Sequence, residues 1–375
     1  MNKHTEARLE DAIIDHLTTQ GGYVFVDYRE GEAKDRYDKA RALDPALVLG
    51  FIQATQEKMW QSLEGIHKAE TGKVVLDHLV KELETKGMLK VLRQGFKCYG
   101  KKLRVAVFAS NNRMNPDTLA LYSKNVLSVT RQLYYGTEHS KSLDLVIFLN
   151  GLPIVTAELK NPLSGQKVEA AKRQYKKDRD HRELLFDFTK RTLAHFAVDQ
   201  DQVLMTTRLS GDKTHFLPFN LGNQGHAGNP PAADGGYRTA YLWREVWQRD
   251  SLLDILGRFM HLQVEEKRIL TDEGSRKITK ETMIFPPVSP TRLCARPGPS
   301  RQGQWPREKP PRPELGGFRQ VQLHRLAGAS PLQPARRRRP ARRGRAGDDA
   351  PGQTAEPELF RLHRHPQIQD EEDLR

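Results

Sequence analysis

The sequence predicts an α/β sandwich, in which helices cover the two faces of a central β-sheet. Short apolar runs of strand length recur through the first 286 residues, and amphipathic stretches of helical period separate them. Strands that alternate with helices are typical of layered α/β folds. The chain has 375 residues, a length that favours about two domains.

Composition and charge narrow the class of protein. Hydrophobic residues make up 37% of the chain, and no stretch approaches the roughly 18 consecutive apolar residues of a membrane-spanning helix. The segment Met1–Leu17 lacks the apolar block of a secretory signal. The two cysteines, Cys98 and Cys294, cannot form a disulfide framework or a four-cysteine zinc site. We therefore expect a soluble, cytoplasmic protein without a membrane partner. Its net charge of +14 fits a polyanionic partner or ordinary surface charge.

Four helical stretches are expected. The first has its apolar side chains on one face and carries Glu10 near its polar edge. The second begins at a cap-like Asp44-Pro45 pair. In order, the expected helical stretches cover Thr5–Leu17, Asp44–Leu89, Gln166–Arg182 and Tyr241–Leu262.

The strands are expected between these helices, where apolar and β-branched residues concentrate. Two of them form one continuous apolar segment, interrupted by Asn150-Gly151. A long loop rich in glycine, asparagine and proline follows at Leu217–Tyr237. In order, the expected strands cover Tyr23–Asp27, Leu103–Ala109, Val126–Tyr135, the two halves of Leu143–Lys160, Ala194–Val198 and Gln202–Thr207.

The segment around Asn150-Gly151 determines whether a site can form. Asn-Gly between apolar runs is a strong hairpin signal. A two-residue turn would place Asp144 opposite Ala157 and turn Glu158 to the other face. A three-residue loop with a bulge would place Asp144 directly opposite Glu158, because a slip of one residue reverses every face. A functional site therefore predicts the odd-numbered loop.

With that register, Asp144, Glu158 and Lys160 converge at the end of an apolar sheet. Two neighbouring carboxylates repel one another unless a cation lies between them, and their oxygens suit Mg²⁺. Such an ion can activate water and stabilise displacement at a phosphodiester, and Lys160 could position the attacking water or offset charge on the phosphate. The alternative is structural: Asp144 opens a strand, and Glu158 and Lys160 form a surface pair.

Other polar residues have two interpretations each. Glu10 can supply a further carboxylate to the site or lie on a solvated helix face. The basic helix that follows the hairpin can bind a DNA backbone, although most charge runs are simply solvated. His181, His195 and His215 lack metal-ligand spacing, which favours core or surface roles. The candidate DNA-binding residues of the basic helix are Lys172, Arg173, Gln174, Tyr175 and Arg179.

The composition changes near Pro286. From this residue to the end lie fifteen of the 22 prolines, and seventeen arginines follow against one lysine, Lys309. No apolar period there could build a core, so we expect residues 287–375 to be disordered. An arginine-rich block can bind nucleic-acid phosphates. A switch from lysine to arginine with rising proline is also typical of a GC-rich gene translated out of frame.

Taken together, these residues resemble one known family. The segment from Asp144 through Glu158-Leu-Lys160 is similar to the nuclease core of type I restriction enzyme R subunits. The similarity spans nearly all of the first 286 residues. Further matching segments are Gln174-Tyr175 with Asp178-Arg179, His195–Val198, Met205–Thr207, Phe216–Asn220, Tyr241–Glu245 and Arg249–Leu256.

The resemblance implies a PD-(D/E)xK fold, the restriction-endonuclease-like sandwich, and a Mg²⁺-dependent endonuclease that acts on double-stranded DNA. It implies that Asp144 and Glu158 hold Mg²⁺, that Lys160 is the catalytic lysine and that Glu10 is the acidic residue of the first helix. Tyr175 corresponds to the tyrosine of a Q-x-x-x-Y motif that helps to place DNA. The position four residues earlier is Ala171, with Gln174 adjacent to the tyrosine instead.

The family also implies a motor and partners. Its R subunits carry helicase domains that use ATP, and they act with modification and specificity subunits. In a shifted reading frame, Arg307–Gln322 permits a sequence that ends in Gly-Ser-Gly-Lys-Ser and resembles a phosphate-binding loop. The same frame permits motor-like segments from Val288–Leu293 and Leu323–Leu332. We therefore expect that a frameshift near Pro287 has replaced the motor, and that this chain does not bind ATP.

The resulting hypothesis divides the chain into an endonuclease domain (1–262), a linker toward the motor (263–286) and an out-of-frame tail (287–375). Two alternatives remain open. The chain can be a free-standing PD-(D/E)xK nuclease that needs no ATP. It can also be a non-catalytic protein that binds DNA through its basic helix and arginine-rich tail.

Overall fold

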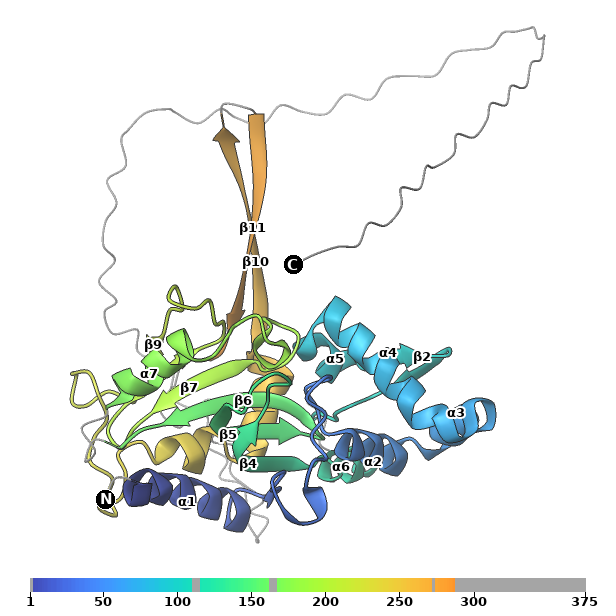
Figure 1. Ribbon diagram of the computed structural model, residues 1–375, viewed down its shortest axis with the longest axis horizontal. Coiled ribbons are helices and arrows are strands. Elements are labelled where there is room, and N and C mark those ends of the chain that lie inside the picture. The colour runs from blue at the N-terminus through green and yellow to red at the C-terminus, as the bar shows by residue number, and fades with distance from the viewer. Residues whose placement is uncertain (1–2, 110–114, 162–166, 272–273, 287–375) are drawn as a thin grey trace, which may run out of the picture. The chain divides into compact units, whose positions relative to one another are not determined.

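A mixed seven-stranded sheet forms the central layer of the computed structural model (Figure 1). The structure describes residues 3–109, 115–161, 167–271 and 274–286. The strand order is β1-β4-β5-β6-β7-β8-β9, with parallel pairing of β1 to β4 and of β6 to β7 and antiparallel pairing elsewhere. The strands are β1 (Tyr23–Phe25), β4 (Leu127–Tyr134), β5 (Ser142–Leu149), β6 (Leu152–Leu159), β7 (Ala194–Val198), β8 (Val203–Thr206) and β9 (Leu217–Pro218).

Helices pack on both faces of this sheet, as the sequence predicted for an α/β protein. One face forms a large apolar core with α1, α2, α4, α5 and α8, and the other forms a smaller core with α7. Short 3-10 turns lie between several of these helices. The α-helices are α1 (Lys3–Thr19), α2 (Pro45–Thr55), α3 (Glu57–His67), α4 (Thr71–Lys86), α5 (Met88–Gln94), α6 (Pro116–Ser123), α7 (Val168–Lys177) and α8 (Arg249–Asp254).

Local sequence signals account for the first two helices. In α1, Leu9, Ile13 and Leu17 are fully buried at the spacing of one helical face. At the start of α2, the Oδ1 atom of Asp44 accepts hydrogen bonds from the backbone N–H groups of Ala46 and Leu47, at 3.0 and 3.2 Å. This cap satisfies donors that a helix start leaves unpaired, and it confirms the predicted helix start.

The β5–β6 hairpin corrects one detail of the prediction. Its turn has two residues, Asn150 and Gly151, with φ angles of 49° and 82°, which is the type I′ geometry that Asn-Gly favours. A Cβ atom on Gly151 would lie 2.5 Å from the carbonyl oxygen of Asp44, so this position requires glycine. The expected three-residue loop is therefore wrong.

The one-residue shift in register arises from a bulge within β6 rather than from the turn. Phe148 pairs with Pro153, but Ile147 pairs with Val155, so Ile154 is an extra residue in a β-bulge. Beyond the bulge, the pairing continues to Leu145 opposite Ala157. The next position in this register sets Asp144 opposite Glu158. The bulge thus produces the pairing that the predicted loop would have produced.

Three other regions differ from the prediction. The expected strand over 103–109 ends at Leu103, where it belongs to a short hairpin of β2 (Phe96–Cys98) and β3 (Lys101–Leu103). The expected helix Tyr241–Leu262 is divided into α8 and two π-helical segments that flank it. Helix α6 was not predicted, although Asn115 and Pro116 cap its start as Asp44 and Pro45 cap that of α2.

The segment 263–286, expected as a linker, is largely paired into strands. A long ribbon of β10 (His261–Thr271) and β11 (Gly274–Ile284) follows the last helical segment (Figure 1). At its base, the ring of Phe285 lies 5.8 Å from that of Phe196, and the hydroxyl of Thr207 donates to the carbonyl of Met283 at 2.8 Å. The core therefore extends past residue 262. The expected tail, residues 287–375, lies outside the described residues.

Among the described residues, none of the helices is long and apolar enough to cross a membrane.

Candidate active site

The bulged β5–β6 pair brings the predicted ionisable residues together. Asp144 lies near the start of β5, Glu158 near the end of β6, and Lys160 directly after β6. The Nζ atom of Lys160 is 3.8 Å from Oδ2 of Asp144. Glu158 is fully buried, and Lys160 is 8% exposed. These residues therefore lie together at one end of an apolar sheet, as the spacing predicted.

Two hydrogen bonds fix the Asp144 carboxylate. The backbone N–H of Leu159, on the neighbouring strand, donates to Oδ2 at 2.8 Å. The side-chain amide of Gln132, on β4, donates to Oδ1 at 3.3 Å. Since both donors belong to adjacent strands, the carboxylate is held by the sheet on both sides.

Gln132 was not predicted as a site residue. Its amide nitrogen also donates to Glu10 Oε2 at 3.2 Å, so one side chain joins the carboxylate of α1 to that of β5. Its φ of 49° lies in the left-handed region, which a residue with a side chain adopts only when its surroundings require it. The pairing of β4 with β5 is also interrupted at Gln132 and Asp144. The residues on either side of Gln132 do not indicate this conformation.

Glu10 thus joins the cluster, which is the position that the family resemblance implied rather than a solvated helix face. It is 8% exposed, and Arg131 Nε lies 3.4 Å from its Oε1. Burial raises the pKa of the Glu10 carboxyl above its usual value, and the negative charge of Asp144 adds to this effect. The hydrogen bond from Gln132 and the charge of Arg131 oppose it.

Glu158 forms a buried ion pair with Arg179, which follows α7. Arg179 Nε donates to Oε1 at 2.7 Å, and a terminal nitrogen of the guanidinium donates to the Ser142 carbonyl at 2.6 Å. The other carboxylate oxygen, Oε2, is buried and has no hydrogen-bond partner among the residues that the structure describes. Burial raises the pKa of Glu158 well above its usual value, the charge of Asp144 raises it further, and Arg179 opposes both.

Backbone pairing positions Lys160. Its N–H donates to the Val198 carbonyl at 2.8 Å, which continues the β6–β7 pairing by one residue. Its Nζ donates to the carbonyl of Leu159 at 2.9 Å. The ammonium group is therefore held beside Asp144.

The donor set fits a hard divalent cation. Within the described part of the chain, no group of three or more His, Cys, Asp or Glu side chains could hold a metal ion. Mg²⁺ does not need such a group, because it is commonly bound through one or two carboxylates together with water and substrate phosphates. Asp144 and Glu158 are two such carboxylates, and Oε2 of Glu158 is a buried acceptor without a hydrogen bond among the described residues.

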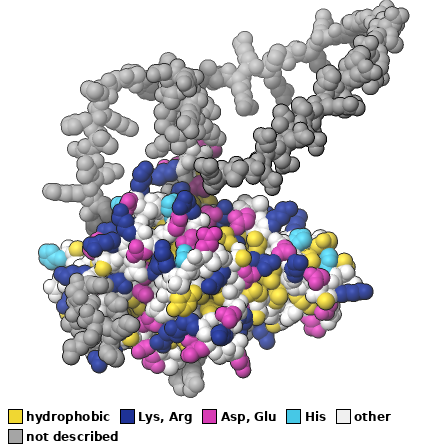
Figure 2. Space-filling model, in the orientation of Figure 1, with side chains coloured by type: hydrophobic (Ala, Val, Ile, Leu, Met, Phe, Trp, Pro, Cys, Tyr) yellow, Lys and Arg dark blue, Asp and Glu magenta, His cyan; other side chains and the backbone are white. Residues whose placement is uncertain are grey.

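The predicted DNA-binding residues, on α7 and directly after it, separate into two groups. Tyr175 and Arg179 are buried, and the hydroxyl of Tyr175 lies 2.8 Å from Thr156 Oγ1. Arg173 is exposed, and Lys172 and Gln174 are partly exposed. Figure 2 shows Lys and Arg side chains interspersed with Asp and Glu on the visible face. Lys172 follows this pattern through its ion pair with Glu169, at 3.0 Å.

His195 lies in the core beneath α7, which is one of the two positions, core or surface, that the sequence favours for it. Its Nδ1 lies 2.8 Å from Thr156 Oγ1, and Phe186 packs against the ring. Burial lowers the pKa of His195 to about 3. The imidazole is therefore neutral in the folded protein at physiological pH.

This burial predicts a loss of stability in mild acid. Between pH 6.5 and 3 the unfolded chain binds a proton at His195 that the folded chain excludes, so the free energy of unfolding falls as the pH falls. This residue alone should lower the free energy of unfolding by about 2 kcal/mol between pH 8 and pH 5. Urea titrations at both pH values test this against His195→Asn, whose amide oxygen can accept from Thr156. The variant should lose this part of the pH dependence, and an unchanged slope would contradict the assignment.

The fold and this cluster define a mixed α/β protein with a candidate acid–base and metal site at the end of its central strands. The model of the type I restriction enzyme R protein N terminus matches residues 3–214. This is more than half of the chain, and it includes every predicted site residue. The chain therefore belongs to this family, as its resemblance predicted. A search of the curated proteins finds no match.

Proposed function

We propose that this chain is the Mg²⁺-dependent DNA endonuclease module of a type I restriction R subunit, with a PD-(D/E)xK fold. One observation carries the proposal: the bulge at Ile154 sets Asp144 opposite Glu158, with the Lys160 ammonium 3.8 Å from Asp144. A simple two-residue hairpin would have turned Glu158 to the opposite face. The family match and the helices on both faces of the mixed sheet support it.

Each residue then has a separate role. Asp144 and Glu158 would hold Mg²⁺, which supplies Lewis-acid activation of the phosphodiester when it is bound. Lys160 would offset the charge that develops on the phosphate, or orient the attacking water. Glu10, tied to Asp144 through Gln132, would add negative charge beside the metal site. Arg179 would keep the buried Glu158 ionised and oriented.

The substrate and partners follow from the family. The substrate would be double-stranded DNA, whose backbone the exposed part of α7 would contact through Arg173, Lys172 and Gln174. Tyr175 would not contact DNA itself but would hold α7 against the sheet through its hydrogen bond with Thr156. Modification and specificity subunits would complete the complex. The ATP-dependent motor would be the part that the out-of-frame tail replaces.

The test compares DNA cleavage by the purified chain alone with cleavage alongside the partner subunits and an intact motor. Supercoiled plasmid is incubated with Mg²⁺ or EDTA, using wild type and Asp144→Asn. We expect little cleavage by the chain alone, because cleavage in the family is coupled to translocation. In the complete complex we expect Mg²⁺-dependent cleavage that Asp144→Asn abolishes.

Other outcomes select the alternatives. Mg²⁺-dependent nicking by the chain alone, lost in Asp144→Asn, would indicate a free-standing nuclease. DNA binding that survives this substitution but disappears on deletion of residues 287–375, without cleavage in any setting, would indicate a non-catalytic binding protein. Cleavage that is insensitive to Asp144→Asn would overturn the proposed site.

A further inference from the structure

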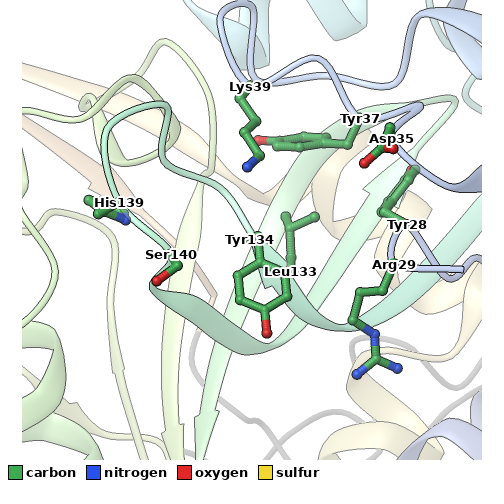
Figure 3. A pocket seen from close by; sticks show the side chains of 9 residues that line it. All are labelled: Tyr28, Arg29, Asp35, Tyr37, Lys39, Leu133, Tyr134, His139 and Ser140. Atoms are coloured by element: carbon green, nitrogen blue, oxygen red, sulfur yellow. The ribbon is translucent and has the colours of Figure 1, made fainter.

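A second feature of the molecule is a pocket of about 720 Å³, lined in part by Leu133 and Tyr134 of β4, the strand that also carries Gln132 (Figure 3). Its wall combines tyrosines with cationic side chains. Tyr37 and Lys39 lie on one side of the pocket, and Tyr134 and Arg29 lie on the other (Figure 3). This volume is within the range of small-molecule and cofactor pockets.

The aromatic groups of the pocket differ in exposure. Tyr134 projects from β4 and is 43% exposed, so much of its ring is open to a ligand. Tyr28 and Tyr37 are buried and pack on one another and on Phe148, at centroid distances of 5.7, 5.8 and 6.0 Å. The Tyr37 hydroxyl is buried and has no hydrogen-bond partner among the described residues. The pocket therefore has a rigid aromatic wall and an open aromatic ring.

Among the described lining residues, Lys39 is the cation that an anionic group of a ligand could pair with. Lys39 forms no ion pair with any residue that the structure describes, whereas Arg29 is paired with Asp27 at 2.7 Å. The acidic member of the lining is Asp35, which can accept a hydrogen bond from an amino group. Aromatic rings for stacking beside cations for phosphate are the features that bind single-stranded nucleic acid.

The pocket is coupled to the candidate active site through β4. Tyr134 lies two residues after Gln132 on this strand, and Gln132 donates hydrogen bonds to both Asp144 and Glu10. Tyr134 also pairs with Ser142, whose carbonyl accepts a hydrogen bond from Arg179. One strand thus connects the pocket lining to the residues proposed to hold the metal.

We propose that this pocket binds an unpaired nucleotide of the DNA strand next to the cleavage position, with its base stacked on Tyr134 and its phosphate near Lys39. The inference rests on the proposed function and deepens it, because it names locally unpaired DNA as the form that the site engages. A paired base inside a duplex cannot present its face to Tyr134, whereas an unpaired base can.

The experiment uses oligonucleotides that carry 2-aminopurine, whose fluorescence falls when the base stacks. The 375-residue chain is titrated, with EDTA present to prevent cleavage, into a duplex with a single-stranded overhang and into a blunt duplex of equal length. We expect quenching of 2-aminopurine in the overhang, and about tenfold weaker overhang binding by Tyr134→Ala. Tyr134→Phe should bind as wild type does, because it keeps the ring.

Matched controls separate stacking from general charge attraction. Tyr99 is also exposed, at 56%, and lies outside the pocket, so Tyr99→Ala should bind the overhang as wild type does. The arginine-rich tail should strengthen overhang and blunt binding alike, which leaves their ratio unchanged. The proposal is overturned if the overhang is not quenched, or if Tyr134→Ala weakens both substrates equally.

The two proposals fail in different ways. If cleavage in the complete complex requires Asp144 but the overhang shows no quenching, the pocket assignment is wrong and the nuclease stands. If quenching depends on Tyr134 but no Mg²⁺-dependent cleavage is found, the pocket binds single-stranded DNA and the nuclease proposal is wrong.

Discussion

Replacing Lys160 with methionine is expected to slow Mg²⁺-dependent DNA cleavage by about a thousandfold while leaving metal binding intact. The Lys160 ammonium lies 3.8 Å from Asp144 and is 8% exposed, so its charge acts where water screens it little. Methionine keeps most of the side-chain stem but removes the charge. Because the lost group is a cation, affinity of the two carboxylates for a divalent metal should stay the same or rise.

The measurement pairs single-turnover cleavage in the complete complex with Mn²⁺ binding by calorimetry on the chain alone. Lys73→Met is the matched control, because this lysine lies on α4 with a side chain that is 68% exposed. The control should cleave at the wild-type rate. A Lys160→Met protein that cleaves normally, or that loses Mn²⁺ affinity along with activity, would show that Lys160 has no direct role in the reaction.

Much of the fold could be predicted because its signals are local. The buried face of α1, the Asp44 cap and the Asn-Gly turn each depend on residues within a few positions of one another. The pairing of Asp144 with Glu158 could also be predicted, since a site required it. The bulge that produces it was not predicted, although Pro153, which has no backbone N–H to donate, directly precedes Ile154.

The parts that could not be predicted depend on contacts between distant segments. Arg179 reaches Glu158 across 21 residues, and its role required knowledge of where α7 ends. Gln132 joins Glu10 and Asp144 through a left-handed backbone conformation that tertiary packing imposes. The expected strand over 103–109 ends early, and side-chain amides of Asn150 and Asn125, rather than a neighbouring strand, bond to the backbone of Val105 and Val107. In these places, packing overrides local preference.

The buried pair of Glu158 with Arg179 leads to the second large effect. Arg179→Met is expected to lower the free energy of unfolding at pH 8 by about 3 kcal/mol, because it leaves a buried carboxylate without its cation. The two side chains are 0% and 4% exposed, so water cannot replace the lost partner. Urea denaturation of wild type, Arg179→Met, Glu158→Gln and the double variant measures the coupling between them. The double variant should lose clearly less free energy of unfolding than the two single variants lose together.

The pH dependence of this loss distinguishes lost charge pairing from lost packing. Arg179 opposes the burial that raises the pKa of Glu158, so its removal should raise that pKa further. A carboxyl whose folded-state pKa is raised binds its proton more tightly when folded, and this stabilises the folded state as the pH falls. The deficit of Arg179→Met should therefore shrink from pH 8 toward pH 5, as Glu158 becomes neutral. A deficit that is constant with pH, and that persists in the double variant, would mean that Arg179 contributes packing alone and that Glu158 does not depend on it to remain ionised.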